Sequence, residues 1–234
     1  MTRSSIEASA SANVRSIQLP SAPLAMLSFA VISCFASETS PFPRTGCSRI
    51  TGFFQQATDV DPTYAAAYAG LADCCLLMGD NGWGSANETF PLASDAALRA
   101  LEIDNGLAEA RATLAHAKFL FYRDFAAAEQ EYLRAIELRP NYATAHHWHA
   151  LFLAAMGRAN EAMREIKLAE DLDPLSLIVR ANVGMIDYFA RRYDAAIAQE
   201  RKVLEADSKF VQARRKLAFA FEAKGIEQEA VDQF

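Results

Sequence analysis

From residue 49 onward, apolar and polar residues follow one another with the spacing of amphipathic helices. Tyr68, Leu71, Ala72 and Cys75 stand at positions i, i+3, i+4 and i+7, and residues with this spacing share one face of a helix. Glycine and proline are sparse, at 10 and 8 residues in 234, which suits a mostly helical chain. The pattern predicts an all-α protein built from short helices.

Small residues within these helices recur at intervals of 34 or 35 positions. One series is Ala128, Ala162, Ala196 and Ala230; a second is Ala115, Ala150, Gly184 and Ala218; a third is Ala100, Ala135, Ala169 and Val203. A fixed period of this length indicates an array of stacked two-helix repeats. Small residues are needed where helix axes cross closely, so we expect these positions to be buried at the crossings.

The same period divides the chain. Residues 1–48 do not follow it and are expected to form a disordered or signal-like leader. The periodic part consists of a half repeat at 49–62, repeats at about 64–105, 107–140, 141–174 and 175–208, and an incomplete repeat at 209–234. Stacked repeats need a polar cap over the last apolar face, and none is recognisable. This favours a piece of a longer array or self-association through uncapped ends.

The first complete repeat departs from the others between its two helices. Ala72 and Ala93 are 21 residues apart, where the later repeats have 12 or 13. We interpret the extra residues as a long loop around 80–88, with the sequence DNGWGSANE. Long loops in compact arrays often bind partners; packing of Trp83 onto the helices is the alternative.

The leader contains one apolar stretch, residues 24–37, which reads LAMLSFAVISCFAS. It is too short to cross a bilayer comfortably, but it has the length of the apolar region of a signal peptide. Residues 31–34 are similar to a lipoprotein cleavage box. Upstream prolines and the presence of only Arg3 and Arg15 as cations argue against export. We predict a cytoplasmic protein, with export or membrane anchoring through 24–37 as the alternative.

Charge and cysteine content narrow the classes of partner. The net charge is −6 and the isoelectric point about 5.3, and lysine and arginine are scattered along the helices. An acidic chain without a basic patch argues against a nucleic-acid partner. The four cysteines have neither metal-ligand spacing nor a disulfide framework, and we expect the adjacent Cys74 and Cys75 to be small core residues.

No motif for catalysis is present. The chain has no Gly-x-Ser-x-Gly, no phosphate-binding glycine loop and no His-Glu-x-x-His. His146 and His149 have the spacing of metal ligands on one helical face, but no carboxylate or cysteine within a turn completes the coordination, and packing is the preferred interpretation. We predict no enzymatic activity, no cofactor and no metal.

The repeats resemble the tetratricopeptide repeat (TPR). That pattern has Leu-Gly or Leu-Ala in the middle of the first helix, glycine at the turn, and alanine followed five residues later by proline at the end of the second helix. The matching residues are Leu71-Ala72, Leu114-Ala115, Leu217-Ala218, Gly157, Gly225, Ala135 with Pro140, and Ala169 with Pro174. The resemblance covers about residues 49–234 and implies a right-handed superhelical solenoid of antiparallel helix pairs.

A narrower resemblance points to one class of TPR array. The stretches AYAGLADCCLLMG, RPNYATAHHWHALFLAAMGR and AEDLDPLSLIV are similar to helical arrays at the C-terminal end of bacterial winged-helix regulators and adenylate cyclases. This resemblance implies an alternative function: a sensory or regulatory region of a bacterial signalling or transcription-regulator protein, separated from its effector domain, with a small ligand as one option.

In TPR arrays the first helices of the repeats line a concave groove that binds proteins or peptides, and this is our leading interpretation. The repeat register carries that wall onto His116, Phe119, His147, Trp148, Asn182, Met185, Tyr188, Phe189 and Arg215. Aromatic anchors in such a groove would hold an extended or helical peptide; burial of several of them by neighbouring helices is the alternative. Only Asn182 and Lys216 match the clamp that holds a chaperone's C-terminal carboxylate in some family members, which argues against that ligand.

Overall fold

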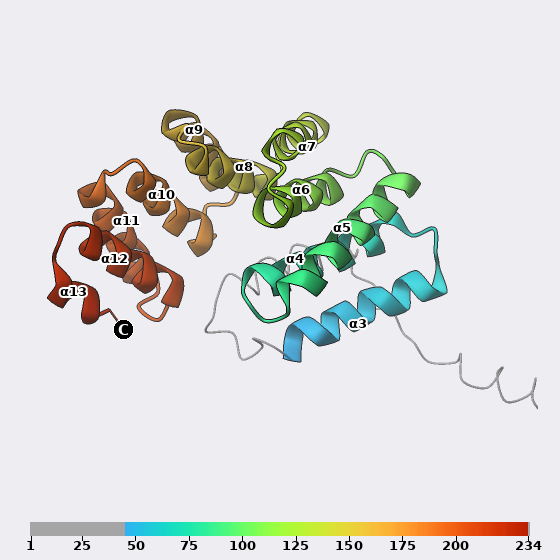
Figure 1. Cartoon of the computed structure of the whole chain (residues 1–234), viewed down its shortest axis with the longest axis horizontal. Helices are drawn as coiled ribbons and strands as arrows, with labels where there is room; N and C mark the ends of the chain where they lie inside the picture. The colour runs from blue at the N-terminus through green and yellow to red at the C-terminus, as the bar shows by residue number, and fades with distance from the viewer. Residues whose placement is uncertain (1–44, 234) are drawn as a thin grey trace, which may run out of the picture.

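The computed structural model describes residues 45–233, which form an arc of packed helices (Figure 1). α3 (Thr45–Val60) precedes five helix pairs. The first helix of each pair, here called helix A, is α4 (Ala65–Asp80), α6 (Ala108–Ala117), α8 (Ala143–Ala155), α10 (Leu177–Phe189) or α12 (Val211–Ala223). The second, helix B, is α5 (Ala86–Ile103), α7 (Phe125–Leu138), α9 (Ala159–Leu172), α11 (Tyr193–Ala206) or α13 (Glu227–Val231).

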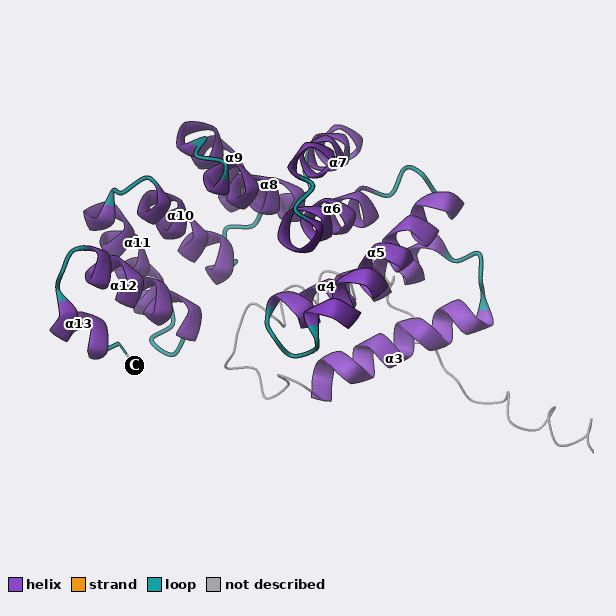
Figure 2. Cartoon of the chain, viewed as in Figure 1, coloured by secondary structure: helices purple, strands orange, loops and turns teal. Residues whose placement is uncertain are grey.

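The described residues contain no β-strand (Figure 2). The predicted all-α, right-handed superhelical solenoid of antiparallel helix pairs is therefore confirmed. The predicted boundary at residue 49 falls inside α3, which begins at Thr45. The apolar stretch 24–37 lies outside the described residues. Among the residues that are described, no helix is long and apolar enough to cross a membrane.

The periodic small residues lie where the helices cross. Ala128, Ala162 and Ala196 of the helix B series are at most 1% exposed. Ala115, Ala150 and Ala218 of the helix A series are at most 3% exposed. Larger side chains such as Tyr132, Phe152 and Ile166 fill the space beside them in one cluster that extends from α4 to α10. The expectation of burial at the crossings is confirmed for these residues.

The A helices form the inner layer of the arc. Each packs on the A helices before and after it, whereas consecutive B helices make no comparable contact with one another. Figure 1 shows α6 and α8 on the inner side and α7 and α9 on the outer side. The turn from helix A to helix B is tight, with Gly157 at φ 77° and Gly225 at φ 74°, where a side chain would be strained.

The long loop predicted at 80–88 is not formed. α4 and α5 have 16 and 18 residues, against 13 and 14 in α8 and α9, and only residues 81–85 connect them. Most of the inserted residues therefore lengthen the two helices. α5 begins at Ala86, so Pro91 lies inside the helix rather than in its first turn, and Trp83 is half-buried in the short connection.

The second repeat contains a different insertion. Ala115 and Ala128 are 13 residues apart, one more than the corresponding pairs in the following repeats. The extra residue is taken up by a π-helical turn, Lys118–Tyr122, that continues α6. Arg123 then adopts a left-handed conformation at φ 58°, and the Asp124 side chain accepts a hydrogen bond from the Ala127 amide to begin α7. A π-turn is the usual way for a helix to absorb one residue.

Candidate functional site

The middle of the inner wall is a closed stack of rings. His116 of α6 stacks on Trp148 of α8 with ring centroids 4.5 Å apart, and its Nδ1 lies 2.6 Å from the Tyr132 hydroxyl. Phe119 makes an edge contact with Phe152 at 5.5 Å. These side chains are all less than 9% exposed. Burial lowers the pKa of His116 to about 3, and nearby His147 lowers it further, so the imidazole is neutral at pH 7.

A line of buried polar groups continues the wall across the next three A helices. The Nε2 of His147 in α8 lies 2.5 Å from the Asn182 amide nitrogen in α10. The Asn182 carbonyl oxygen accepts a hydrogen bond of 2.5 Å from Lys216 Nζ in α12. All three residues are at most 7% exposed. Burial lowers the pKa of His147 to about 3, which leaves its Nε2 free to accept a hydrogen bond.

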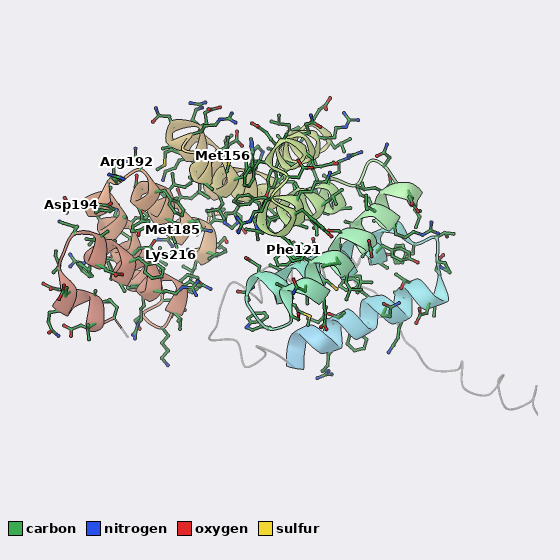
Figure 3. All side chains as sticks on the ribbon, viewed as in Figure 1. Phe121, Met156, Met185, Arg192, Asp194 and Lys216 are labelled. Carbon is green, nitrogen blue, oxygen red and sulfur yellow. The ribbon has the colours of Figure 1, made fainter. Side chains whose placement is uncertain are left out.

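The accessible part of the predicted groove lies on the last two complete A helices. Phe189 of α10 is 52% exposed and Phe219 of α12 is 36% exposed. Met185 is half-buried and Arg215 is exposed. Figure 3 labels Met185 and Lys216, which lie on these two neighbouring helices. Tyr188 is half-buried, and its ring contacts those of Phe189 and Tyr193.

Opposite charges from the two ends of the arc come within electrostatic reach. Asp80, the last residue of α4, is open to solvent but has protein on several sides, and this partial enclosure raises its pKa. Arg215 of α12 opposes the shift. The guanidinium also donates a hydrogen bond of 2.6 Å to Gln212 Oε1. The accessible part of the inner surface therefore carries a cation beside its apolar residues, with an acid facing it.

The nine predicted groove residues thus separate into two sets. The structure brings together His116, Phe119, His147, Trp148 and Asn182 in the buried wall, each at most 8% exposed. The other four, Met185, Tyr188, Phe189 and Arg215, keep accessible surface. The repeat register identified the inner helix faces but not how deeply each side chain is covered.

The histidine pair considered for a metal is used for packing contacts. His146 Nδ1 lies 2.7 Å from Glu165 Oε2, and its Nε2 lies 2.9 Å from the Pro140 carbonyl oxygen. The hydrogen bond to Glu165 raises the pKa of His146, and the same contact lowers the pKa of Glu165 to about 2. Within residues 45–233 no group of three histidine, cysteine or acidic residues could hold a metal ion. Cys74 and Cys75 are buried, as expected of core residues.

One residue that the sequence interpretation missed is Glu200 of α11. Its side chain is 1% exposed, and neither carboxylate oxygen has a hydrogen-bond partner among the described residues. The signal was available, because Glu200 stands 34 residues after Ile166 and 68 after Tyr132, both fully buried. Aligning the B helices by their period places an acid in an apolar position.

Solved structures share this fold. TTC0263, a thermophilic TPR protein of Thermus thermophilus, is 21% identical with a TM-score of 0.63, over 74% of this chain and 89% of that one. The APC/C hetero-tetramer Cut9–Hcn1 gives 16% identity and a TM-score of 0.66, over 81% and 36%. Human IFIT1, in a dimer with m7Gppp-AAAA, gives 16% and 0.69, over 80% and 45%.

These likenesses show that the chain has the TPR fold. No family model and no curated protein sequence matches the chain. The narrower resemblance to arrays of bacterial regulators is not tested by these structures and stays a prediction. The same holds for the expectation that nucleic acid is not a partner.

Proposed function

We propose that this chain is a protein-interaction scaffold that holds a peptide segment against the inner surface of its last two complete A helices. The observation that carries the proposal is the exposure of Phe189 and Phe219, 52% and 36%, on helices whose other large side chains are mostly buried. Exposed aromatic residues grouped on one surface are typical of a recognition site.

The surrounding residues support a peptide rather than a small polar ligand. Met185 offers a flexible apolar surface beside Phe189, and such thioether side chains adapt to different partners. Arg215 supplies a cation at the edge of the apolar area, which suits a carboxylate on the partner. The buried wall behind them is neutral at pH 7, because His116 and His147 have lowered pKa values. We therefore expect affinity to come from apolar anchors and orientation from Arg215.

Peptide selection on the full chain tests this proposal. A phage-displayed peptide library is panned against the protein, and the selected peptides are titrated by fluorescence anisotropy against wild type, Phe189→Asp and Phe219→Asp. We expect at least about tenfold weaker binding to each variant, because a carboxylate in an apolar contact leaves a charge without solvation. The matched control is Leu133→Asp on α7, a residue 52% exposed on a B helix, which should bind like wild type.

The proposal fails if the selected peptides bind both phenylalanine variants as tightly as wild type. It also fails if Leu133→Asp weakens binding to the same extent, since the effect would then follow from net charge. Circular dichroism of each variant separates loss of binding from loss of fold.

A further inference from the structure

A cleft on the outer side of the arc has no role in the groove described above. Its walls come from one face of α9 and from Arg192 at the turn between α10 and α11, and it has a volume of about 650 Å³. The α9 residues include Met163, Arg164, Lys167, Leu168 and Asp171, which share one helical face. We call this surface the α9 cleft. Figure 3 labels Arg192 at this edge of the arc.

The floor of the cleft is apolar. Leu168 is 46% exposed and Met163 is half-buried beside it. The opposite face of α9 is used by the core, where Ala162, Ile166 and Ala169 are fully buried. Because the core is already satisfied by that opposite face, Leu168 has no packing role within the described part of the fold.

Cations outnumber acids around this floor. Arg164, Lys167 and Arg192 line the cleft, against one carboxylate from Asp171, in a chain whose net charge is −6. Arg164 forms no ion pair within residues 45–233, since none is found among their salt bridges. Arg192 is fixed in position by Asp187, whose Oδ1 accepts its Nε–H at 2.8 Å. An exposed guanidinium and a fixed one therefore flank an apolar strip.

The charge pattern belongs to this repeat and is not a feature of every B helix. Thirty-four residues earlier, the same face of α7 carries Glu129, Gln130, Leu133, Arg134 and Glu137. There one arginine stands beside two glutamates, and Arg134 is paired with Glu137 at 2.6 Å. The equivalent surface of the preceding repeat thus has the opposite balance of charge.

We propose that the α9 cleft docks an acidic amphipathic helix from a partner protein. The partner's apolar residues would lie on Met163 and Leu168, and its glutamates or aspartates would face Arg164, Lys167 and Arg192. The strip from Met163 to Leu168 and Asp171 matches about two turns of helix, and an apolar face with i, i+3 and i+4 anchors is the usual form of such a ligand. This inference does not depend on the groove proposed above, which lies on the A helices.

The test uses a synthetic helical peptide of about fifteen residues, long enough for marginal helicity, made of glutamate, leucine and alanine, with the leucines along one face and glutamates on both sides. A second peptide has lysine in place of every glutamate. Binding to the full chain is measured by fluorescence anisotropy at low salt, where charge complementarity is screened least. The acidic peptide should bind and the lysine peptide should not.

Three variants locate the binding. Arg164→Glu with Lys167→Glu should weaken binding of the acidic peptide by at least about tenfold, and Leu168→Asp by a similar factor. Asp171→Asn should strengthen it, because the only acid in the cleft is removed. The matched control is Arg134→Glu, the same charge change on the equivalent face of α7. All these positions are exposed, so the fold should be retained, and thermal unfolding of each variant verifies this.

Several outcomes would overturn the proposal. One is that the acidic peptide does not bind, or that Arg134→Glu weakens its binding as much as the cleft variants do. Another is that Asp171→Asn has no effect or weakens binding. If a single-stranded oligonucleotide of equal charge binds more tightly and loses affinity in the Arg164→Glu, Lys167→Glu variant, the cleft recognises nucleic acid instead.

Discussion

The B helices of the second, third and fourth repeats place different chemistry in one core position. Tyr132 of α7, Ile166 of α9 and Glu200 of α11 follow each other at intervals of 34 residues, and each is at most 1% exposed. Tyr132 has its hydroxyl bonded to His116, whereas both oxygens of Glu200 lack a hydrogen-bond partner within the described chain. Two repeats therefore have a satisfied core, and the next encloses a carboxylate.

Neighbouring residues differ together with Glu200. Gly184 stands where α6, α8 and α12 have alanine, and a Cβ added there would lie 2.5 Å from Glu200 Oε1. Lys216, buried on α12, supplies positive charge to the same region. Burial raises the pKa of Glu200 and lowers that of Lys216, and each charge opposes the shift of the other. The comparison teaches that a solenoid core position accepts an acid when both flanking A helices change with it.

The largest effect is expected at the apolar end of this comparison. Tyr132→Ala should lower the free energy of unfolding by about 4 kcal/mol, because it leaves a cavity and removes the hydrogen-bond partner of His116. Tyr132→Phe should cost only about 1 kcal/mol, the value of one hydrogen bond. Chemical denaturation measures both. A cost below about 1 kcal/mol for Tyr132→Ala would show that the position is not a rigid core site.

Removing the countercharge should have the next largest effect. Lys216→Met should destabilise the protein by about 3 kcal/mol, because Glu200 and Asn182 then lose their cation. Lys216→Met combined with Glu200→Ile, which restores the residue type of the third repeat, should return stability to within about 1 kcal/mol of wild type or above it. A double-mutant cycle from denaturation curves gives the coupling. Strictly additive costs would contradict an interaction between the two side chains.

The enclosed carboxylate should make stability depend on pH. Burial raises the pKa of Glu200 from 4.5 to about 8, so between these values the folded state binds more protons than the unfolded state. Stability is then highest below the unfolded pKa and falls as the pH rises through this window. Glu200→Gln should remove that contribution, so its stability relative to wild type should rise by about 1 kcal/mol or more from pH 5 to pH 8.

Exposed Glu205 on the same helix provides the control for this titration. Glu205→Gln should follow the wild-type pH profile, because the loss of a solvated carboxylate leaves the buried one in place. A wild-type profile for Glu200→Gln as well would mean that Glu200 ionises alike in the folded and unfolded states.

The smallest effect is expected at Gly184. Gly184→Ala gains helix propensity of about 1 kcal/mol, but its methyl group would meet Glu200 Oε1 at 2.5 Å and the Ala196 carbonyl oxygen at 3.3 Å. We expect a net loss of about 1 kcal/mol in the wild-type background. In the Glu200→Ile background, the pair would match Ala150 and Ile166 of the third repeat, and Gly184→Ala should become stabilising. Thermal unfolding of the four proteins checks the change of sign.

The insertions show why spacing alone gave an incomplete prediction of the fold. Nine additional residues between Ala72 and Ala93 were interpreted as a loop, but α4 and α5 are extended instead. Separation between two small residues does not reveal whether the intervening chain is helical. Residues such as Met78, Glu88 and Thr89 can continue a helix, and hydrogen bonds within the lengthened pair decided the outcome. The one-residue insertion before Ala128 likewise became a π-turn.

The candidate site was predictable in direction but not in depth. Trp148 and Phe189 were both placed on inner helix faces by the register, yet Trp148 is 6% exposed and Phe189 52% exposed. The difference comes from their neighbours, since His116 covers the indole ring of Trp148. That contact joins residues 32 positions apart in different repeats, and no property of either residue alone specifies it.

The sequence by itself determined the architecture, because a period of small residues fixes where helices can cross and the apolar stripes fix which faces must be covered. The tertiary structure decided which inner side chains remain accessible and how Glu200 is accommodated. It also decided that Arg192 stands opposite the basic face of α9. These features depend on contacts between helices from different repeats, and the physical reason is that burial and electrostatic interaction are properties of a side chain's surroundings rather than of its place in the repeat.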